Sequence, residues 1–143
     1  MAAMVPGSNT VEVLDEEESL ALLGSAEVGR VGVVVDGQPL IFPVNHVLEG
    51  RSIVMRTDST RILSGASLAR VAFEADGFDA GARSGWTVLV EGIGNDVTEA
   101  LDTTSERLQA VPVAPWAPGP KARLLRIDVR TITGRRFAGE RSN

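Results

Sequence analysis

The sequence predicts a mainly β fold: an antiparallel β-barrel of six strands, closed or half-open, with short helices. The first observation is valine-rich Val28–Val35, followed by Asp36-Gly37, a dipeptide favoured in two-residue turns between antiparallel strands. The second is that the other predicted strands are short and separated by turn residues, a pattern typical of barrels. The expected strands are 28–35, 38–48, 51–57, 71–75, 86–92 and 124–129.

Two of the predicted helices have a recognisable start. Asp15 is expected to cap the first helix, and Glu18, three residues later, completes a capping box. Ser59 or Thr60 is the expected cap of the second helix, since a side-chain oxygen there accepts from a free backbone N–H. Two or three short helices are expected in all, over 15–24, 61–68 and 103–110.

The chain has the length of one domain. Its 143 residues can bury a single core, whereas two domains of half this size would both be marginal. We expect this domain over 11–137, between a flexible N-terminal tail, 1–10, and a C-terminal tail, 138–143. Pro39 and Pro43 lack the N–H group that a central strand uses, so their strand is expected at a sheet edge or a bulge.

The composition argues against several classes of function. The net charge is −5, without the basic excess that nucleic-acid binding needs. The absence of cysteine excludes disulfides and thiol catalysis, and one histidine with scattered carboxylates predicts no metal site. No apolar run approaches the roughly 18–20 residues of a membrane span, and Met1–Thr10 lacks signal-peptide features. We therefore expect a cytoplasmic protein without nucleic-acid or membrane partners.

The segment 55–61 carries the clearest binding signal. A strand is predicted to end and a helix to begin there, and free backbone N–H groups at a helix start attract anions. Arg56 and Arg61 flank hydroxyl residues that include Thr57 and Thr60, and arginine binds phosphate oxygens in pairs. The segment therefore predicts a site for a phosphate-bearing cofactor. The alternative is a surface arginine pair beside an ordinary helix cap.

A second candidate is the run Pro43-Val44-Asn45. A proline in a strand leaves nearby backbone groups unpaired, and the Asn45 amide both donates and accepts, as the polar edge of a heteroaromatic ring requires. His46 follows as the one imidazole of the chain. Residues 45 and 46 point to opposite faces of a strand, so at most one faces a given pocket.

The two tryptophans are further candidates. Ser84-Gly85-Trp86 opens a predicted strand after a polar loop, and packing in the core or at an interface is the alternative role for its indole. Trp116 lies in a proline-rich connection, where a large aromatic side chain generally covers a core, a partner or a flat ligand. No set of nucleophile, base and acid can be assembled, so catalytic residues stay unassigned.

Several short motifs occur in an order and spacing that resemble a known family. They are Val28-Gly29-Arg30-Val31, Asp36-Gly37-Gln38-Pro39, Pro43-Val44-Asn45, Arg56-Thr57, Val71–Asp76, Ser84–Val88 and Gly134–Phe137. Over about residues 11–137 the sequence is similar to the pyridoxamine 5′-phosphate oxidase-like flavoproteins, in the branch that includes nitroimidazole-resistance-type proteins. The resemblance implies an FMN-binding split β-barrel that forms a homodimer with two flavin sites between the subunits.

The resemblance also implies roles for single residues. The FMN phosphate would lie near Arg56, Thr57 and Arg61, and the isoalloxazine ring along Pro43–Asn45. It places Ser84, Gly85 and Trp86 near the flavin or the interface, and Trp116 over the ring of the partner chain.

The function that this resemblance implies is an FMN-dependent oxidoreductase that reduces a small molecule, with a nicotinamide as electron donor. The flavin carries the hydride, so the missing acid–base set does not argue against redox chemistry. Vitamin B6 oxidation is not expected, because the additional basic residues of true pyridoxamine phosphate oxidases have no counterpart that we can place. The alternatives are a deazaflavin-dependent reductase of the same fold and a non-enzymatic protein that binds flavin, haem or another ligand.

Overall fold

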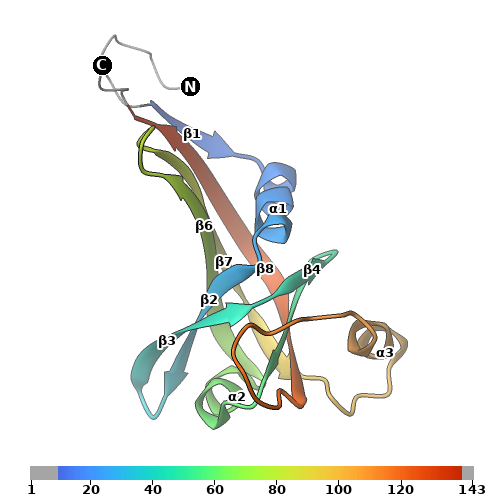
Figure 1. Cartoon of the computed structure of the whole chain (residues 1–143). Coiled ribbons are helices and arrows are strands. Elements are labelled where there is room, and N and C mark those ends of the chain that lie inside the picture. Colours follow the sequence, from blue (N-terminus) through green and yellow to red (C-terminus); the bar gives the residue numbers. More distant parts are fainter. Residues whose placement is uncertain (1–9, 140–143) are drawn as a thin grey trace.

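A computed structural model describes residues 10–139, as one curled antiparallel sheet with three short helices in this part of the chain (Figure 1). The strands are β1 (Thr10–Leu14), β2 (Val28–Val35), β3 (Gln38–Asn45), β4 (Val47–Glu49), β5 (Ser52–Thr57), β6 (Ala69–Asp79), β7 (Ser84–Asp96) and β8 (Arg123–Ala138). The helices are α1 (Glu16–Ser25), α2 (Thr60–Ala66) and α3 (Thr103–Gln109).

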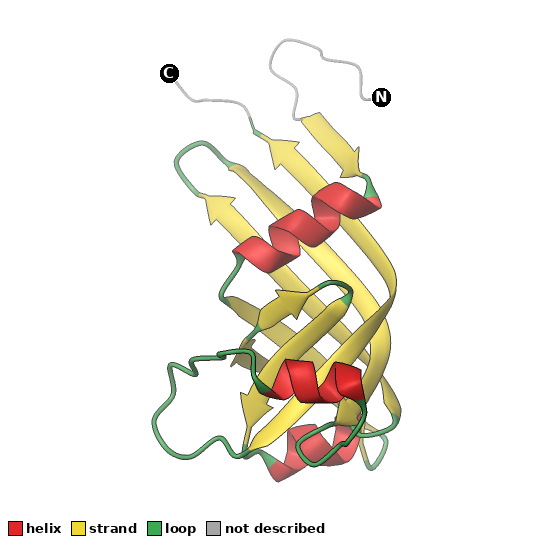
Figure 2. Cartoon of the chain, turned by 90° about the vertical axis from the view of Figure 1, so that its right-hand side faces the viewer, coloured by secondary structure: helices red, strands yellow, loops and turns green. Residues whose placement is uncertain are grey.

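The sheet is organised around the long strand β8. The strand order is β3-β2-β6-β7-β8-β5-β4, and β1 pairs with the far end of β8. The first residues of β8 pair with β5, as in Leu125 opposite Met55, and its last residues pair with β1, as in Gly134 opposite Leu14. Figure 2 shows the strands curving around one side, with α1 lying across them. The predicted antiparallel half-barrel is therefore confirmed.

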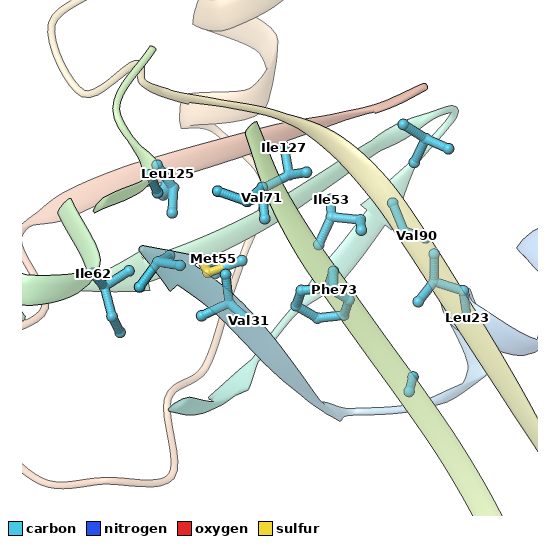
Figure 3. Packing of buried hydrophobic residues seen from close by; sticks show 14 of the residues in the cluster. Leu23, Val31, Ile53, Met55, Ile62, Val71, Phe73, Val90, Leu125 and Ile127 are labelled. Carbon is cyan, nitrogen blue, oxygen red and sulfur yellow. The ribbon is translucent and has the colours of Figure 1, made fainter. Parts of the chain in front are cut away.

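The inner face of the curled sheet holds the main core. Alternate residues of the strands meet there, and Phe73 on β6 is completely buried among them (Figure 3). Gly29 on β2 makes room for this ring, because a Cβ atom at Gly29 would lie 2.3 Å from Phe73 Cζ. A smaller cluster lies under α3 and contains Val54, Val97, Leu108, Val113 and Leu124.

The local predictions are confirmed. Asp36 and Gly37 both have positive φ, 51° and 76°, as the tight hairpin between β2 and β3 requires. The Asp15 side chain accepts from the Glu18 N–H at 2.8 Å, and Ser59 caps α2. The two prolines lie on β3, which forms an edge of the sheet.

The strand count and several strand bounds differ from the prediction. Residues 10–139 form eight strands instead of six: the predicted 38–48 strand is split into β3 and β4, and β1 is additional. The predicted 76–84 loop lies mostly in β6 and β7, and β8 continues to Ala138 instead of ending at residue 129. Residues 76–79 and 84–87 pair with each other in a hairpin, and the end of β8 pairs with β7 and β1. The propensity of these polar, glycine-containing segments does not indicate this pairing.

The described residues bear on only part of the two predicted tails. Thr10 and Ala138 pair with each other at the ends of β1 and β8. Residues 1–9 and 140–143 lie outside the described part, so the prediction of flexible tails stays a prediction there. Within residues 10–139, no helix is both long and apolar enough to cross a membrane.

Candidate functional site

Most of the predicted binding residues lie around one end of the sheet. The surrounding elements are the end of β3, the end of β5, the start of α2 and the loop 110–122 that follows α3 (Figure 1). We call this region the cradle. The loop is attached to β3 through Trp116 and to the start of α2 through Lys121.

The β5–α2 junction is built by short-range hydrogen bonds. Thr57 is buried, and its Oγ1 accepts from the Ser59 N–H at 3.0 Å. Ser59 Oγ in turn accepts from the Ile62 N–H at 3.2 Å, which starts α2. Thr60 and Arg61, in the first turn, are exposed, and N–H groups at this position of a helix point out of its end. Polar donors thus surround the start of α2.

Arg61 has a partner that the sequence analysis missed. Its guanidinium lies 5.9 Å from the ring centroid of Phe42, on the edge strand β3. This places a cation and an aromatic face at the same rim of the barrel. Strand alternation could have indicated this position of Phe42. Phe42 lies on the same face of β3 as Val44, and both side chains pack against the edge of the core.

Arg56 and Thr57 do not lie together, although they are adjacent in sequence. Thr57 shares the inner face of β5 with Met55, whereas Arg56 points to the side of α3 together with Val54. The Arg56 guanidinium donates to the backbone carbonyl of Gln109 at 3.2 Å. The structure therefore divides the predicted phosphate residues into an α2 group and a separate arginine beside α3.

The end of β3 holds the loop 110–122. Asn45 Oδ1 accepts from the Trp116 N–H at 2.7 Å, and Asn45 Nδ2 donates to the Glu27 carbonyl at 3.3 Å. A hollow of about 250 Å³ lies beside this bond, between the β3–β4 corner and loop residues 112–116. The Trp116 side chain is 69% exposed. Trp116 is thus anchored to Asn45 of its own chain and presents its indole outward.

Lys121 attaches the loop 110–122 to the residue before the cap of α2. Its ammonium lies 3.4 Å from the Asp58 carboxylate and donates to the Pro118 carbonyl at 3.3 Å. A further cation therefore lies near the start of α2.

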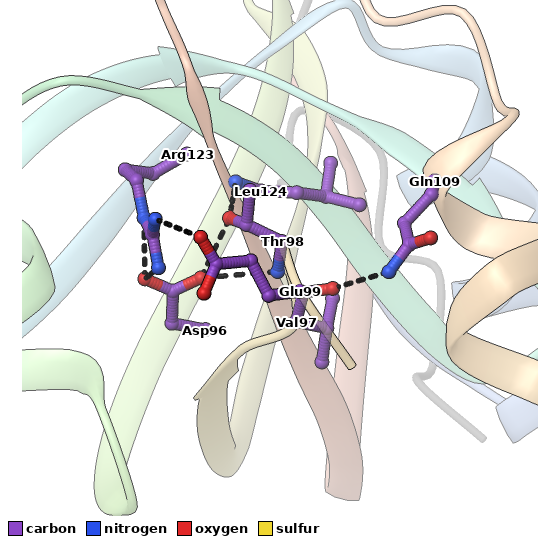
Figure 4. Close-up of polar contacts among 7 residues, drawn as sticks. All are labelled: Asp96, Val97, Thr98, Glu99, Gln109, Arg123 and Leu124. Carbon is purple, nitrogen blue, oxygen red and sulfur yellow. Dashed lines mark hydrogen bonds and ion pairs between the residues drawn. The ribbon is translucent and has the colours of Figure 1, made fainter. Parts of the chain in front are cut away.

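A polar network fixes the segment that leads into α3 (Figure 4). The Asp96 carboxylate accepts from Thr98 and from the Arg123 guanidinium, and these partners hold the pKa of Asp96 below its usual value against the opposing effect of burial. Gln109 Nε2 donates to the carbonyls of Val97 at 2.7 Å and Ala100 at 2.9 Å. Because the Gln109 carbonyl receives Arg56, this network positions that arginine as well.

His46 lines the hollow beside Asn45, and its imidazole is bonded to α1. Its Nε2 lies 2.9 Å from the Leu23 carbonyl of α1, and its ring meets Phe73 edge-on at 4.9 Å. Burial lowers the pKa of His46, opposed by the bond to Leu23, so the imidazole is a neutral core residue at neutral pH. His46 is therefore a buried side chain with one bonded ring nitrogen, Nε2, while Nδ1 has no hydrogen-bond partner within residues 10–139.

Ser84, Gly85 and Trp86 lie at the other end of the sheet. The Trp86 indole packs against Gly77, where a Cβ atom would come 2.5 Å from Nε1. Gly94, eight residues further along β7, touches α2. At about 3.4 Å per residue, roughly 27 Å of strand separates Trp86 from Gly94, which lies against Ala66 at the end of α2. One chain alone does not bring these residues to the cradle.

Comparisons with known proteins agree with this architecture. The family model described as pyridoxamine 5′-phosphate oxidase matches residues 15–136. The uncharacterized protein Rv0080 of Mycobacterium tuberculosis is 31% identical over 133 residues, which cover 89% of this chain and 86% of that protein.

Two solved structures are similar along nearly their whole length. An FAD-binding protein from Mycobacterium smegmatis has a TM-score of 0.73 and 34% identity, covering 88% of this chain and 97% of that one. A candidate pyridoxamine 5′-phosphate oxidase from Corynebacterium glutamicum has a TM-score of 0.77 and 30% identity, covering 92% and 96%. The protein therefore belongs to the pyridoxamine 5′-phosphate oxidase-like family of split β-barrels.

Proposed function

We propose that this protein binds a flavin nucleotide in the cradle, FMN being the predicted form, and uses it as an oxidoreductase on a small molecule. The observation that carries the proposal is Arg61, which lies at the first turn of α2 and over the ring of Phe42. A phosphate and a flat aromatic ring linked by a short chain need this combination of a cation and an apolar surface.

The residues of the cradle fit such a ligand. Arg61 and Thr60 offer donors to a phosphate, and Lys121 adds a second positive charge nearby. Asn45 has a polar amide at the end of β3, beside the exposed indole of Trp116. The similarity to the Mycobacterium smegmatis protein, which is named as binding FAD, also supports a flavin ligand. The flavin would supply hydride transfer when bound, while these residues bind and orient it.

A titration that separates phosphate from ring tests this proposal. FMN and riboflavin differ by the phosphate alone, so their affinities are compared by fluorescence quenching in the wild type and two variants. We expect Arg61→Ala to weaken FMN binding by about 1.5–3 kcal/mol, as loss of a charge-assisted bond does, with little change for riboflavin. Arg56→Ala is expected to have a smaller effect, because its guanidinium bonds to the Gln109 carbonyl. Unchanged FMN affinity in both variants would place the phosphate elsewhere.

The same titration separates the cofactor alternatives. FAD and a deazaflavin cofactor are tested beside FMN on the purified protein. Tightest binding of the deazaflavin would favour the deazaflavin-dependent reductase. Binding of FMN without turnover by NADH or NADPH and a panel of small acceptors would favour a non-enzymatic flavin-binding protein.

We also propose that the protein forms a homodimer through the cradle end. Leu68, Leu101 and Trp116 are large apolar side chains at this end, and each is at least 69% exposed. A partner subunit that covered them would also cover the flavin, as the family resemblance implies. Light scattering at micromolar concentration tests this: a dimer is expected, and a Leu101→Ser, Trp116→Ser double variant is expected to be monomeric. A monomeric wild type would contradict the shared site.

A further inference from the structure

The hollow beside Asn45 has the size of a site for a small molecule. It has a volume of about 250 Å³ and lies between the start of β2, the β3–β4 corner and the loop 110–122. Val47, Pro112 and Val113 form its apolar walls. The volume is below the roughly 300–1,000 Å³ of sites for drug-sized ligands, so the hollow suits a molecule with a single ring.

Both Asn45 and His46 line this hollow, although they are neighbours in the sequence. Neighbouring residues of a strand point to opposite faces, but β3 ends at Asn45, and His46 lies in the corner between β3 and β4. Strand alternation therefore does not separate the two residues here, and an amide and an imidazole meet at one place.

His46 supplies a buried hydrogen-bond acceptor. The residue is 5% exposed, and its Nε2 lies 2.9 Å from the Leu23 carbonyl. A carbonyl oxygen can only accept, so Nε2 carries the proton of the neutral ring and Nδ1 keeps a free lone pair. Nδ1 has no hydrogen-bond partner within residues 10–139. Because a buried acceptor without a donor is unfavourable, a ligand that donates a hydrogen bond to Nδ1 gains stability there.

The other polar groups at the corner are already paired. Asn45 Oδ1 accepts from the Trp116 N–H, and Asn45 Nδ2 donates to the Glu27 carbonyl. The same carbonyl accepts from the His46 N–H at 3.1 Å. These bonds fix the corner and the loop around the hollow, and they leave Nδ1 to the ligand.

The charge of the hollow disfavours an anion. Glu27 is the acidic residue of the lining, and none of the described residues that line the hollow is a lysine or an arginine. Arg61 and Lys121, the cations near the start of α2, lie outside this lining. A phosphate is therefore expected at Arg61, and an uncharged molecule in the hollow.

We propose that the hollow binds an uncharged molecule with a single ring that donates an O–H or N–H hydrogen to His46 Nδ1. The ring lies among Val47, Pro112 and Val113. This site goes beyond the proposed flavin binding, because the atom that holds the ligand is not among the groups assigned to the flavin.

A matched pair of probes tests the hydrogen bond. 4-Fluorophenol and 4-fluorotoluene have nearly the same shape, but only the phenol can donate. Fluorine NMR on the purified full chain measures both dissociation constants. We expect the phenol to bind at least tenfold more tightly than the toluene, and 4-fluorobenzoate, an anion, to bind more weakly than the phenol.

His46 is also its own reporter, because it is the one histidine of the chain. In protein without a histidine tag, the Nδ1 resonance is therefore identified directly by nitrogen NMR. A ring nitrogen that accepts a hydrogen bond shifts upfield. We expect this shift on titration with 4-fluorophenol and no shift with 4-fluorotoluene, a difference that a merely apolar pocket would not produce.

Two alanines of the loop give a matched pair of variants. Ala114 lines the hollow and Ala117 does not, and both are exposed, so neither substitution disturbs the core. Ala114→Leu is expected to weaken 4-fluorophenol binding at least tenfold, and Ala117→Leu is expected to leave it unchanged. His46→Phe keeps a ring without its nitrogens and is expected to give the two probes equal affinities. Arg61→Ala is expected to weaken FMN binding only, which separates this proposal from flavin binding.

Three outcomes would overturn the proposal. Binding of 4-fluorophenol without a shift of Nδ1 would show that the imidazole does not hold the ligand. Binding of neither probe at millimolar concentration would show that the hollow takes water alone. Displacement of 4-fluorophenol by FMN would show that the hollow is part of the flavin site.

Discussion

The two faces of the sheet are built from alternate residues of the same strands, yet they differ in how completely they are filled. On β2, Val31 and Val33 point inward and are at most 3% exposed, whereas Val34 points outward and is 58% exposed. On β6, Phe73 is fully buried, and its neighbour Ala72 forms the floor of an open groove. The inner face is closed by helices and by the curl of the sheet. The outer face is covered by α3 at β5 and the start of β8 and is open over β2 and β6.

Glycines on β2 illustrate the same difference. A Cβ atom at Gly29 would lie 2.3 Å from the ring of Phe73, but one at Gly32 would meet Ala72 at 3.5 Å, an ordinary contact. The two glycines lie three residues apart on β2. Packing against Phe73 requires Gly29, whereas Gly32 leaves a space beside Ala72. On β2, therefore, the volume of the core side chains determines the residues of the inner face, while the outer face leaves a hollow.

The largest effect is expected from emptying the inner face. Phe73→Ala removes a ring from the centre of the core, where no solvent can replace its contacts. The expected loss is about 3–5 kcal/mol of the free energy of unfolding. Urea denaturation followed by circular dichroism measures it. A loss below 1 kcal/mol would mean that the core is not closed around this ring.

The glycine pair gives the next largest effect. Gly29→Ala forces Phe73 or the adjacent backbone of Glu74 to shift, and we expect a loss of about 1–3 kcal/mol. Gly32→Ala is its matched control on the same strand and is expected to change stability by less than about 0.5 kcal/mol. Equal effects of the two substitutions on the urea midpoint would remove the distinction between the faces.

The two faces are also expected to respond to pH in opposite directions. On the inner face, burial lowers the pKa of His46 from its usual 6.5. The folded state therefore disfavours the proton that the unfolded state takes up, and stability contributed by neutral His46 is lost as pH falls below about 6.5. His46→Gln keeps an N–H for the Leu23 carbonyl and is expected to flatten this decrease. Thermal unfolding between pH 5 and pH 8 provides the measurement.

The smallest effect is expected from Glu74 on the outer face, whose contribution to stability decreases as the pH rises. Burial and the neighbouring Asp76 raise the pKa of Glu74 to about 7, although Arg30 lies 3.4 Å away and opposes the shift. The protonated carboxyl is favoured in the folded state, so its contribution is complete below about pH 4.5 and is lost as pH rises through about 7. Glu74→Gln is expected to remove this loss in the same series of unfolding curves. A steeper loss at high pH in the variant would contradict the assignment.

Features that depend on a few consecutive residues were predictable from the sequence. The Asp36-Gly37 turn, the caps at Asp15 and Ser59, and the position of the prolines on an edge strand are of this kind. The position of Arg61 at the start of α2 also followed from the local pattern.

The candidate site was predictable only in part. Arg56 was grouped with Thr57, but strand alternation places the two on opposite faces of β5. Phe42 was not selected, because its proximity to Arg61 arises from β3 meeting α2, some twenty residues later in the chain. Trp116 and Asn45 were separate candidates, and a hydrogen bond across 71 residues joins them.

By itself, then, the sequence determined the turns, the caps, the alternation of the strands and the set of polar residues available for a phosphate. Hydrogen bonds within three or four residues decide these features, so the local residue types suffice. Only the tertiary structure decided how far β8 extends, which face each arginine occupies and that the outer face holds a groove. These depend on the register between strands whose paired residues lie 40 to 76 positions apart, and a shift of one residue would move every side chain to the other face.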